Sequence, residues 1–190
     1  MRAFIAIDLP PQIKDAISKT QDKFKNALPK ISWVKPVNLH LTLKFLGEIS
    51  PKQLDLINQI IDKICSKANN FKIRLEAMDL LPDIARARII WIGTEKIEAQ
   101  LQQIVEELET KLSQLGIPKE KRHFCAHITI GRIKTHIAPS ILEETLGKLK
   151  NGLLREKLKF AAEKITLFQS TLGPAGPDYA VLKEANFKIT

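Results

Sequence analysis

Two stretches of the same form, HLTLKFLGE (residues 40–48) and HITIGRI (residues 127–133), decide the fold expected for this chain. Each begins His-apolar-Thr-apolar, although the chain contains only four histidines. Alternation of polar and apolar residues is typical of a β-strand with one buried face. The His and the Thr of each stretch then share the other face, because side chains two positions apart point the same way. We therefore expect two strands that each present an imidazole beside a hydroxyl.

The elements around the first stretch recur in the same order around the second. In each half, hydrophobic periodicity predicts a strand, a helix, the His-containing strand, a second helix and a closing strand. The expected elements are 3–7, 11–28, 40–46, 51–64 and 71–77 in the first half, and 89–92, 97–115, 124–130, 142–149 and 160–168 in the second. The spacing from Phe4 to His40 also nearly equals that from Ile90 to His127.

This repetition predicts an α+β fold of two β-α-β-α-β halves related by an approximate two-fold axis. We place the halves at about 1–80 and 88–170, with a C-terminal strand over 177–190 that returns to the fold. No linker is long or polar enough to separate them, so we expect a single domain over 1–190. Because the halves already supply a symmetric cleft within one chain, a monomer is expected.

The composition favours a globular, basic protein. The chain has 190 residues, of which 44% are hydrophobic, enough to bury one sizeable core. Its 30 Lys and Arg outnumber its 21 Asp and Glu, which gives a net charge of +9. A basic surface of this size attracts polyanions, with nucleic acid first among them. The alternative is a solvated lysine-rich surface that serves solubility.

The sequence contains no secretory signal, no apolar segment of membrane-spanning length and no disulfide framework, so we expect a cytoplasmic protein. No phosphate-binding Gly-rich loop and no nucleophile elbow is present, and no cofactor is expected. A zinc site at His123, Cys125 and His127 is the main alternative. On an extended strand the two histidines would lie about 13 Å apart at Cα, too far to share one ion without a bend. No metal is therefore expected.

The paired His and Thr suit phosphate chemistry. Residues i and i+2 on a strand lie about 6.5–7 Å apart at Cα, so both side chains can bond to one phosphate group. If the two strands face each other across a cleft, two imidazoles flank the phosphorus and two hydroxyls hold its non-bridging oxygens. One neutral imidazole then takes a proton from the attacking water, and one imidazolium protonates the departing oxygen. A single His-x-Thr in a strand is more often structural, but two copies at equivalent positions favour this function.

The pair HLTL (40–43) and HITI (127–130) resembles the two HxTx signatures of the 2H phosphoesterase superfamily. Within it the chain looks like the RNA 2',3'-cyclic phosphodiesterase family, historically called 2'-5' RNA ligases. The supporting stretches are RAFIAIDLP (2–10), WVKPVNLHLTLKFLGEI (33–49), RIIWIG (88–93) and GPDYAVL (176–182). The resemblance implies a bilobal α+β fold with two antiparallel sheets around a central cleft. It also implies metal-independent opening of a 2',3'-cyclic phosphate, on RNA ends or nucleotides, to a 2'-phosphate.

The resemblance also assigns roles that spacing alone does not distinguish. It makes His40 the proton donor and His127 the proton acceptor, with Thr42 and Thr129 holding the phosphate. Arg132 matches an arginine of the family, but strict alternation places it on the face opposite His127 unless Gly131 permits a bulge. A surface ion pair is the other interpretation of Arg132.

Three further residues are candidates for RNA contacts. Lys44 shares the motif face under strict alternation, and Trp33 and Tyr179 are suited to stack a terminal base. Trp33 is equally well explained as a hydrophobic anchor. Two alternative functions stay open. The first is ligation of RNA halves through a 2'-5' bond, which needs the same acid and base. The second is non-catalytic RNA binding, in which the HxTx segments only hold phosphate.

Overall fold

The two His-containing stretches form β3 (His40–Glu48) and β7 (His127–Ile133), which lie next to each other in one sheet. The computed structural model describes residues 1–190 except 27, 175 and 190. The remaining helices are α1 (Pro11–Lys25), α2 (Pro51–Cys65), α3 (Ala99–Ser113) and α4 (Pro139–Leu153), with short 3-10 turns η1 (Pro36–Asn38) and η2 (Leu154–Glu156). The remaining strands are β1 (Arg2–Asp8), β2 (Ile31–Trp33), β4 (Phe71–Arg74), β5 (Ala77–Leu81), β6 (Ile89–Gly93), β8 (Lys159–Ala162), β9 (Lys164–Gly173) and β10 (Gly176–Asn186).

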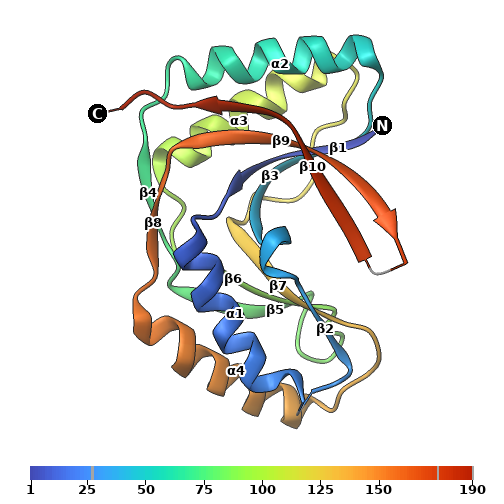
Figure 1. Cartoon of the computed structure of the whole chain (residues 1–190), viewed down its shortest axis with the longest axis vertical. Helices are drawn as coiled ribbons and strands as arrows, with labels where there is room; N and C mark the ends of the chain where they lie inside the picture. The colour runs from blue at the N-terminus through green and yellow to red at the C-terminus, as the bar shows by residue number, and fades with distance from the viewer. Residues whose placement is uncertain (27, 175, 190) are drawn as a thin grey trace.

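The strands form two antiparallel sheets, so the expected α+β class is confirmed (Figure 1). The large sheet has the order β10-β9-β1-β3-β7-β6-β5, with β2 also paired to β7, and the small sheet is β4-β8. Strands β3 and β7 pair only at Leu41 and Ile128. The large sheet therefore consists of two leaves joined at one point: β10-β9-β1-β3, which we call leaf A, and β2-β7-β6-β5, which we call leaf B.

The helices pack in two pairs. Helices α2 and α3 contact each other at leaf A, and α1 and α4 contact each other at leaf B. Figure 1 shows the first pair at one end of the molecule and the second pair at the other. None of the described helices is both long and apolar enough to cross a membrane. The expected start of α2 is confirmed, because Ser50 Oγ accepts from the Gln53 backbone N–H at 3.2 Å and completes a capping box.

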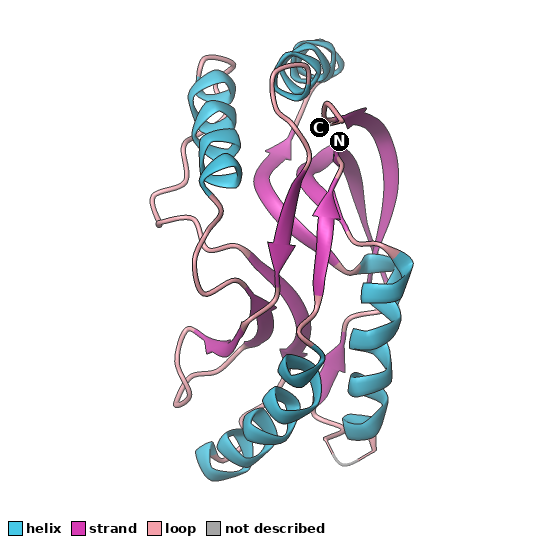
Figure 2. Ribbon diagram, turned by 90° about the vertical axis from the view of Figure 1, so that its left-hand side faces the viewer, coloured by secondary structure: helices cyan, strands magenta, loops and turns pink. Residues whose placement is uncertain are grey.

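Alternation along β1 separates the core from the site. Ala3, Ile5 and Ile7 join the main hydrophobic core, whereas Phe4 and Ala6 join a second apolar cluster with Phe168. The first set faces the helices and the second lies on the side of His40, whose ring centroid is 4.7 Å from that of Phe4. One face of leaf A is thus committed to the core, and the other is left to build a site. Figure 2 shows the helices and strands from the side, turned by 90° from Figure 1.

The two closing strands differ from the expectation. Residues 71–77 and 160–168 were each expected to be one strand, and this is wrong: the chain forms β4 and β5 in the first region and β8 and β9 in the second. Each region changes sheet partway, because β4 and β8 pair with each other whereas β5 pairs with β6 and β9 with β1. The expected C-terminal strand corresponds to β10, and residues 27 and 190 of the expected elements lie outside the described residues.

These crossings mean that each leaf takes strands from both halves of the sequence. Strand β9 follows the second motif but pairs in leaf A, and β5 follows the first motif but pairs in leaf B. The boundaries 1–80 and 88–170 therefore remain our proposal for the repeated unit of sequence, and the leaves describe its arrangement in space.

Candidate active site

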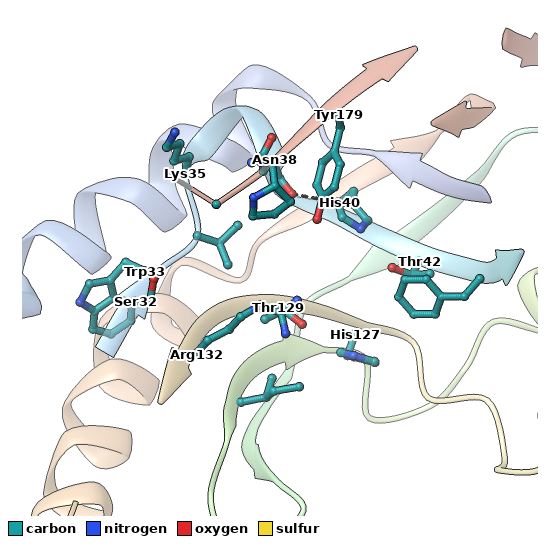
Figure 3. Close-up of a pocket in the computed structure, with 15 residues that line it drawn as sticks. Ser32, Trp33, Lys35, Asn38, His40, Thr42, His127, Thr129, Arg132 and Tyr179 are labelled. Atoms are coloured by element: carbon teal, nitrogen blue, oxygen red, sulfur yellow. Dashed lines mark hydrogen bonds between the residues drawn. The ribbon is translucent and has the colours of Figure 1, made fainter. Parts of the chain in front are cut away.

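Both His-x-Thr pairs open into one pocket between the two leaves, with a volume of about 350 Å³ (Figure 3). His40 and Thr42 line it from β3, and His127 and Thr129 line it from β7. The other lining residues are Ser32, Trp33, Val34, Lys35, Asn38, Phe45, Ile89, Arg132, Gly176, Pro177 and Tyr179. The central expectation, two imidazoles and two hydroxyls at one cleft, therefore corresponds to the geometry found here.

The two imidazoles are held in the same way. His40 Nδ1 lies 2.8 Å from the Asn38 carbonyl oxygen, and His127 Nδ1 lies 2.8 Å from the Cys125 carbonyl oxygen. A carbonyl oxygen only accepts, so Nδ1 carries the hydrogen of each neutral ring and Nε2 is left with the lone pair. Each ring thus bonds to the residue two positions before it and keeps Nε2 available for proton transfer.

His40 is the more enclosed of the two histidines. Its ring contacts Phe4 at 4.7 Å and Tyr179 edge-on at 5.3 Å. Burial is the main cause that lowers the pKa of His40 from 6.5 to about 4, and the nearby Lys14 and Arg132 cations lower it further. His40 is therefore neutral at pH 7 while the pocket is empty.

This low pKa predicts a pH dependence of stability. The folded state binds the His40 proton more weakly than the unfolded state, whose pKa is near 6.5, so the free energy of unfolding decreases as pH falls from 6.5 towards 4. The contribution of His40 is about 3 kcal/mol. We expect urea denaturation at pH 7 and pH 4 to show this extra loss in the wild type and not in His40→Gln. Equal losses in the two proteins would contradict the low pKa.

A bulge in β7 brings Arg132 into the pocket. Ile90 pairs with Gly131 and Trp91 pairs with Thr129, so Ile130 has no partner on β6. This extra residue reverses the alternation, as the sequence allowed for at Gly131, and places Arg132 on the side of His127. A side chain at Gly131 would crowd Trp33, with an added Cβ only 3.2 Å from its ring.

A matching bulge in β3 removes Lys44 from the pocket. Ile5 pairs with Lys44 and Ala6 with Thr42, which leaves Leu43 unpaired, at the same offset from His40 as Ile130 is from His127. Lys44 is only 5% exposed. Its ammonium group donates to both Glu109 carboxylate oxygens at 2.8 Å and to the Pro118 carbonyl at 2.7 Å. The expectation that Lys44 faces RNA is therefore wrong, because the bulge turns it towards α3.

Phe45 takes the place expected for Lys44. It lines the pocket five residues after His40, as Arg132 does five residues after His127, and it is 65% exposed. Sequence reasoning missed Phe45, yet a signal existed. Once a bulge is allowed after the second motif, the repetition implies one after the first.

The two aromatic candidates both line the pocket. Tyr179 contacts the ring of His40, and burial raises the pKa of its hydroxyl. Trp33 also packs against the hydrophobic core, so it has the anchoring role that the sequence left open. Asn38, which sequence reasoning missed, donates its Nδ2 hydrogen to the Pro177 carbonyl at 2.7 Å and fixes the start of β3 against β10.

The zinc alternative finds no support in the geometry. Among the residues that the structure describes, no group of three or more His, Cys, Asp or Glu is arranged to hold a metal ion. His123 and His136 are exposed and lie outside the pocket lining.

A duplicated α+β fold that sets two imidazoles and two threonines around one pocket defines the class of two-histidine phosphoesterases. The chain belongs to the LigT-like phosphoesterase family, whose model matches residues 7–91 and again 92–179. The duplication inferred from the repeated motif is thus confirmed.

Individual relatives agree along nearly the whole chain. The RNA 2',3'-cyclic phosphodiesterase of Methanocaldococcus jannaschii is 39% identical and covers 97% of this chain and 99% of its own length. That of Methanothermobacter thermautotrophicus is 31% identical, with 94% and 95% covered. Among solved structures, TT0787 of Thermus thermophilus has a TM-score of 0.83 at 25% identity, with 99% of this chain and 98% of that chain covered. LigT of E. coli in complex with 3'-AMP has a TM-score of 0.78 at 26% identity, with 98% and 97% covered.

Proposed function

We propose that this phosphodiesterase hydrolyses the 2',3'-cyclic phosphate at an RNA end to a 2'-phosphate, with His40 and His127 as acid and base. The observation that carries the proposal is the pair of imidazoles held alike through Nδ1, each with a threonine two residues on, around one pocket. The relatives named as RNA 2',3'-cyclic phosphodiesterases support this substrate. The basic net charge of +9 suits an RNA ligand.

The proposed reaction removes one proton from the attacking water and delivers one proton to the departing oxygen. His127 Nε2 removes a proton from water as its oxygen attacks phosphorus, and the bond between phosphorus and O3' breaks. The Nε2 proton of His40 goes to O3', which leaves a 3'-hydroxyl and a 2'-phosphate. Thr42 and Thr129 donate hydrogen bonds to the non-bridging oxygens, and Arg132 offsets their charge. Afterwards His127 releases its proton to solvent and His40 regains one.

The acid role requires His40 to be protonated when substrate is bound, although its pKa in the empty pocket is about 4. A bound phosphate anion beside the ring favours the imidazolium and raises the pKa of His40. Binding therefore supplies the charge that completes the acid, and the family-based assignment of His40 as donor stays part of the proposal. The opposite assignment, with His40 as base, uses the same two groups.

The test is the product formed by EDTA-treated protein from an oligoribonucleotide that ends in a 2',3'-cyclic phosphate. We expect a terminal 2'-phosphate, resolved from the 3'-phosphate by chromatography. A 3'-phosphate product would contradict the proposed bond cleavage, and loss of turnover in EDTA would contradict the metal-free reaction. A parallel reaction also contains an RNA half with a 5'-hydroxyl and tests 2'-5' ligation. If the protein ligates, joined product appears in this reaction and not in the first.

We also propose that the protein acts as a monomer, since one chain supplies both motifs of the pocket, and that it works in the cytoplasm, which suits its two free cysteines. A single species of about 21.5 kDa in sedimentation would agree with a monomer.

A further inference from the structure

Strands β2 and β7 extend the face of the pocket beyond its rim. Ser32 pairs with Arg132, and both side chains line the pocket. The next pair, Ile31 and Ile133, is buried and faces the core. One residue further, the Lys134 N–H donates to the Lys30 carbonyl at 3.2 Å, which continues the antiparallel register. Lys30 and Lys134 are exposed and each lies one residue outside its strand, β2 and β7 respectively. This register is consistent with side chains on the same face as those of Ser32 and Arg132.

Four cations therefore follow one another from the pocket outward. Lys35 and Arg132 line the pocket, and Figure 3 shows both side chains. Lys30 and Lys134, bonded to each other through their backbones, lie two residues from Ser32 and Arg132 along the chain. We call these four residues the cationic strip: Lys30, Lys35, Arg132 and Lys134.

The strip is not neutralised by the protein. None of its members forms an ion pair with a described residue, whereas Lys14, close to His40, pairs with Asp8 at 2.7 Å and the buried Lys44 pairs with Glu109. Like charges directly opposite on neighbouring strands repel each other and are destabilising. A polyanion on the strip removes this repulsion.

We propose that the cationic strip binds the phosphodiester backbone of the RNA on the 5' side of the cyclic phosphate. This inference rests on the proposed function, because a terminal cyclic phosphate at the histidines leaves only the 5' side of the chain to extend out of the pocket. On the side of leaf A the RNA would meet Phe45, Pro177 and Tyr179. On the side of leaf B it would meet the cations Lys35 and Arg132. Charge complementarity directs the backbone along leaf B.

The spacing of the cations sets how many phosphodiesters upstream of the cyclic phosphate the strip can contact. Lys134 lies two residues beyond Arg132 and one residue past the end of β7, a step of about 6.5–7 Å at Cα in an extended chain. This step is comparable with the spacing of consecutive phosphates in an extended single strand, so the Lys30 and Lys134 pair meets the first or second phosphodiester upstream of the cyclic phosphate. Lysine contacts to phosphate carry no base information, so the preference is for RNA length and not for sequence.

The test compares substrates of different length in a double variant, Lys30→Gln/Lys134→Gln. Its matched control is Arg74→Gln/Lys159→Gln, which removes another exposed cross-strand pair of like charge from the small sheet, outside the pocket lining. The substrates are a nucleoside 2',3'-cyclic phosphate and a hexaribonucleotide with the same terminus, each at 50 and 200 mM salt. Binding of a labelled hexaribonucleotide with a 3'-phosphate, which is not turned over, is measured in parallel by fluorescence anisotropy.

We expect kcat/KM for the hexanucleotide at low salt to fall roughly tenfold in the strip variant, and the slope of log affinity against log salt to decrease by about 1.4, the value for two phosphate contacts of a single strand. Turnover of the nucleoside cyclic phosphate by the strip variant should change less than about twofold, because this substrate has no upstream phosphate to contact the strip. The control variant should also change less than about twofold in every measurement, because its strip is intact.

Equal effects of the strip and control variants on hexanucleotide binding would contradict RNA binding by the cationic strip and leave the proposed function intact. Absence of wild-type turnover on every cyclic phosphate would overturn the proposed function. In that case the anisotropy measurement still decides whether the strip binds RNA.

Discussion

We expect His40→Gln and His127→Gln each to lower turnover of RNA 2',3'-cyclic phosphate by a factor of about 10²–10⁴, the typical contribution of one general acid or base. Glutamine keeps a polar side chain of similar size at the pocket but transfers no proton near neutral pH. We expect kcat/KM of the wild type to be bell-shaped in pH and to lose one limb in each variant. Rapid-quench or steady-state assays with one oligoribonucleotide measure this pH dependence for the wild type and both variants.

The matched control is His123→Gln, because His123 is an exposed histidine that does not line the pocket. It should retain wild-type turnover. Binding of an RNA 3'-phosphate should survive in the His40 and His127 variants within roughly tenfold, since Thr42, Thr129 and the cationic strip remain. If binding is lost in step with turnover, the histidines contribute to binding and not to proton transfer. If the wild type binds RNA without turning it over and the variants bind it more weakly, the site only holds phosphate.

The sequence predicted the paired strands and histidines because their signals are local. In β3 and β7, apolar residues such as Leu41 and Ile128 alternate with the functional side chains, and both are fully buried. The same alternation placed Lys44 wrongly and left Arg132 undecided. A bulge adds a single residue that composition does not mark, and only Gly131 gave a hint of one.

Strand partners were harder to predict than strands. The closing regions 71–77 and 160–168 have the right composition for β-structure, but pattern alone does not show that each divides between two sheets. That division depends on contacts distant in sequence, such as the Leu75 N–H donating to the Leu158 carbonyl at 2.8 Å. The same long-range pairing interleaves the two halves, so that a motif from each reaches one pocket.

This interleaving also explains why the pocket is asymmetric although the motifs are not. Phe45 and Arg132 occupy equivalent positions after the two histidines, yet one is apolar and the other is a cation. His40 lies among Phe4 and Tyr179, which lower its pKa by burial, whereas His127 lies edge-on to Trp91 at 6.0 Å. Two similar strands therefore hold imidazoles in different surroundings, and the proposed acid and base need such a difference.

Gly93→Ala should damage both stability and activity, because the backbone of Ala126 and His127 lies directly against Gly93. Gly93 pairs with His127, and a Cβ at this position would overlap the Ala126 backbone oxygen and lie 3.1 Å from the His127 Cα. The same oxygen accepts a hydrogen bond from the Thr94 N–H at 3.2 Å, so it is not free to move aside. We expect a loss of about 1–3 kcal/mol in the free energy of unfolding. A displacement of His127 by about 1 Å lowers kcat by roughly 10².

The control for this change is Gly147→Ala in α4, where an added Cβ meets no atom within 4 Å. Alanine in a helix interior is more favourable than glycine, so this variant should gain about 0.5–1 kcal/mol and keep full activity. Urea denaturation and turnover measured on both variants separate a general effect of added methyl groups from a local one. A Gly93→Ala protein with wild-type kcat would mean that β7 shifts without moving His127, and that the imidazole is positioned by its bond to the Cys125 carbonyl and not by the contact between the strands.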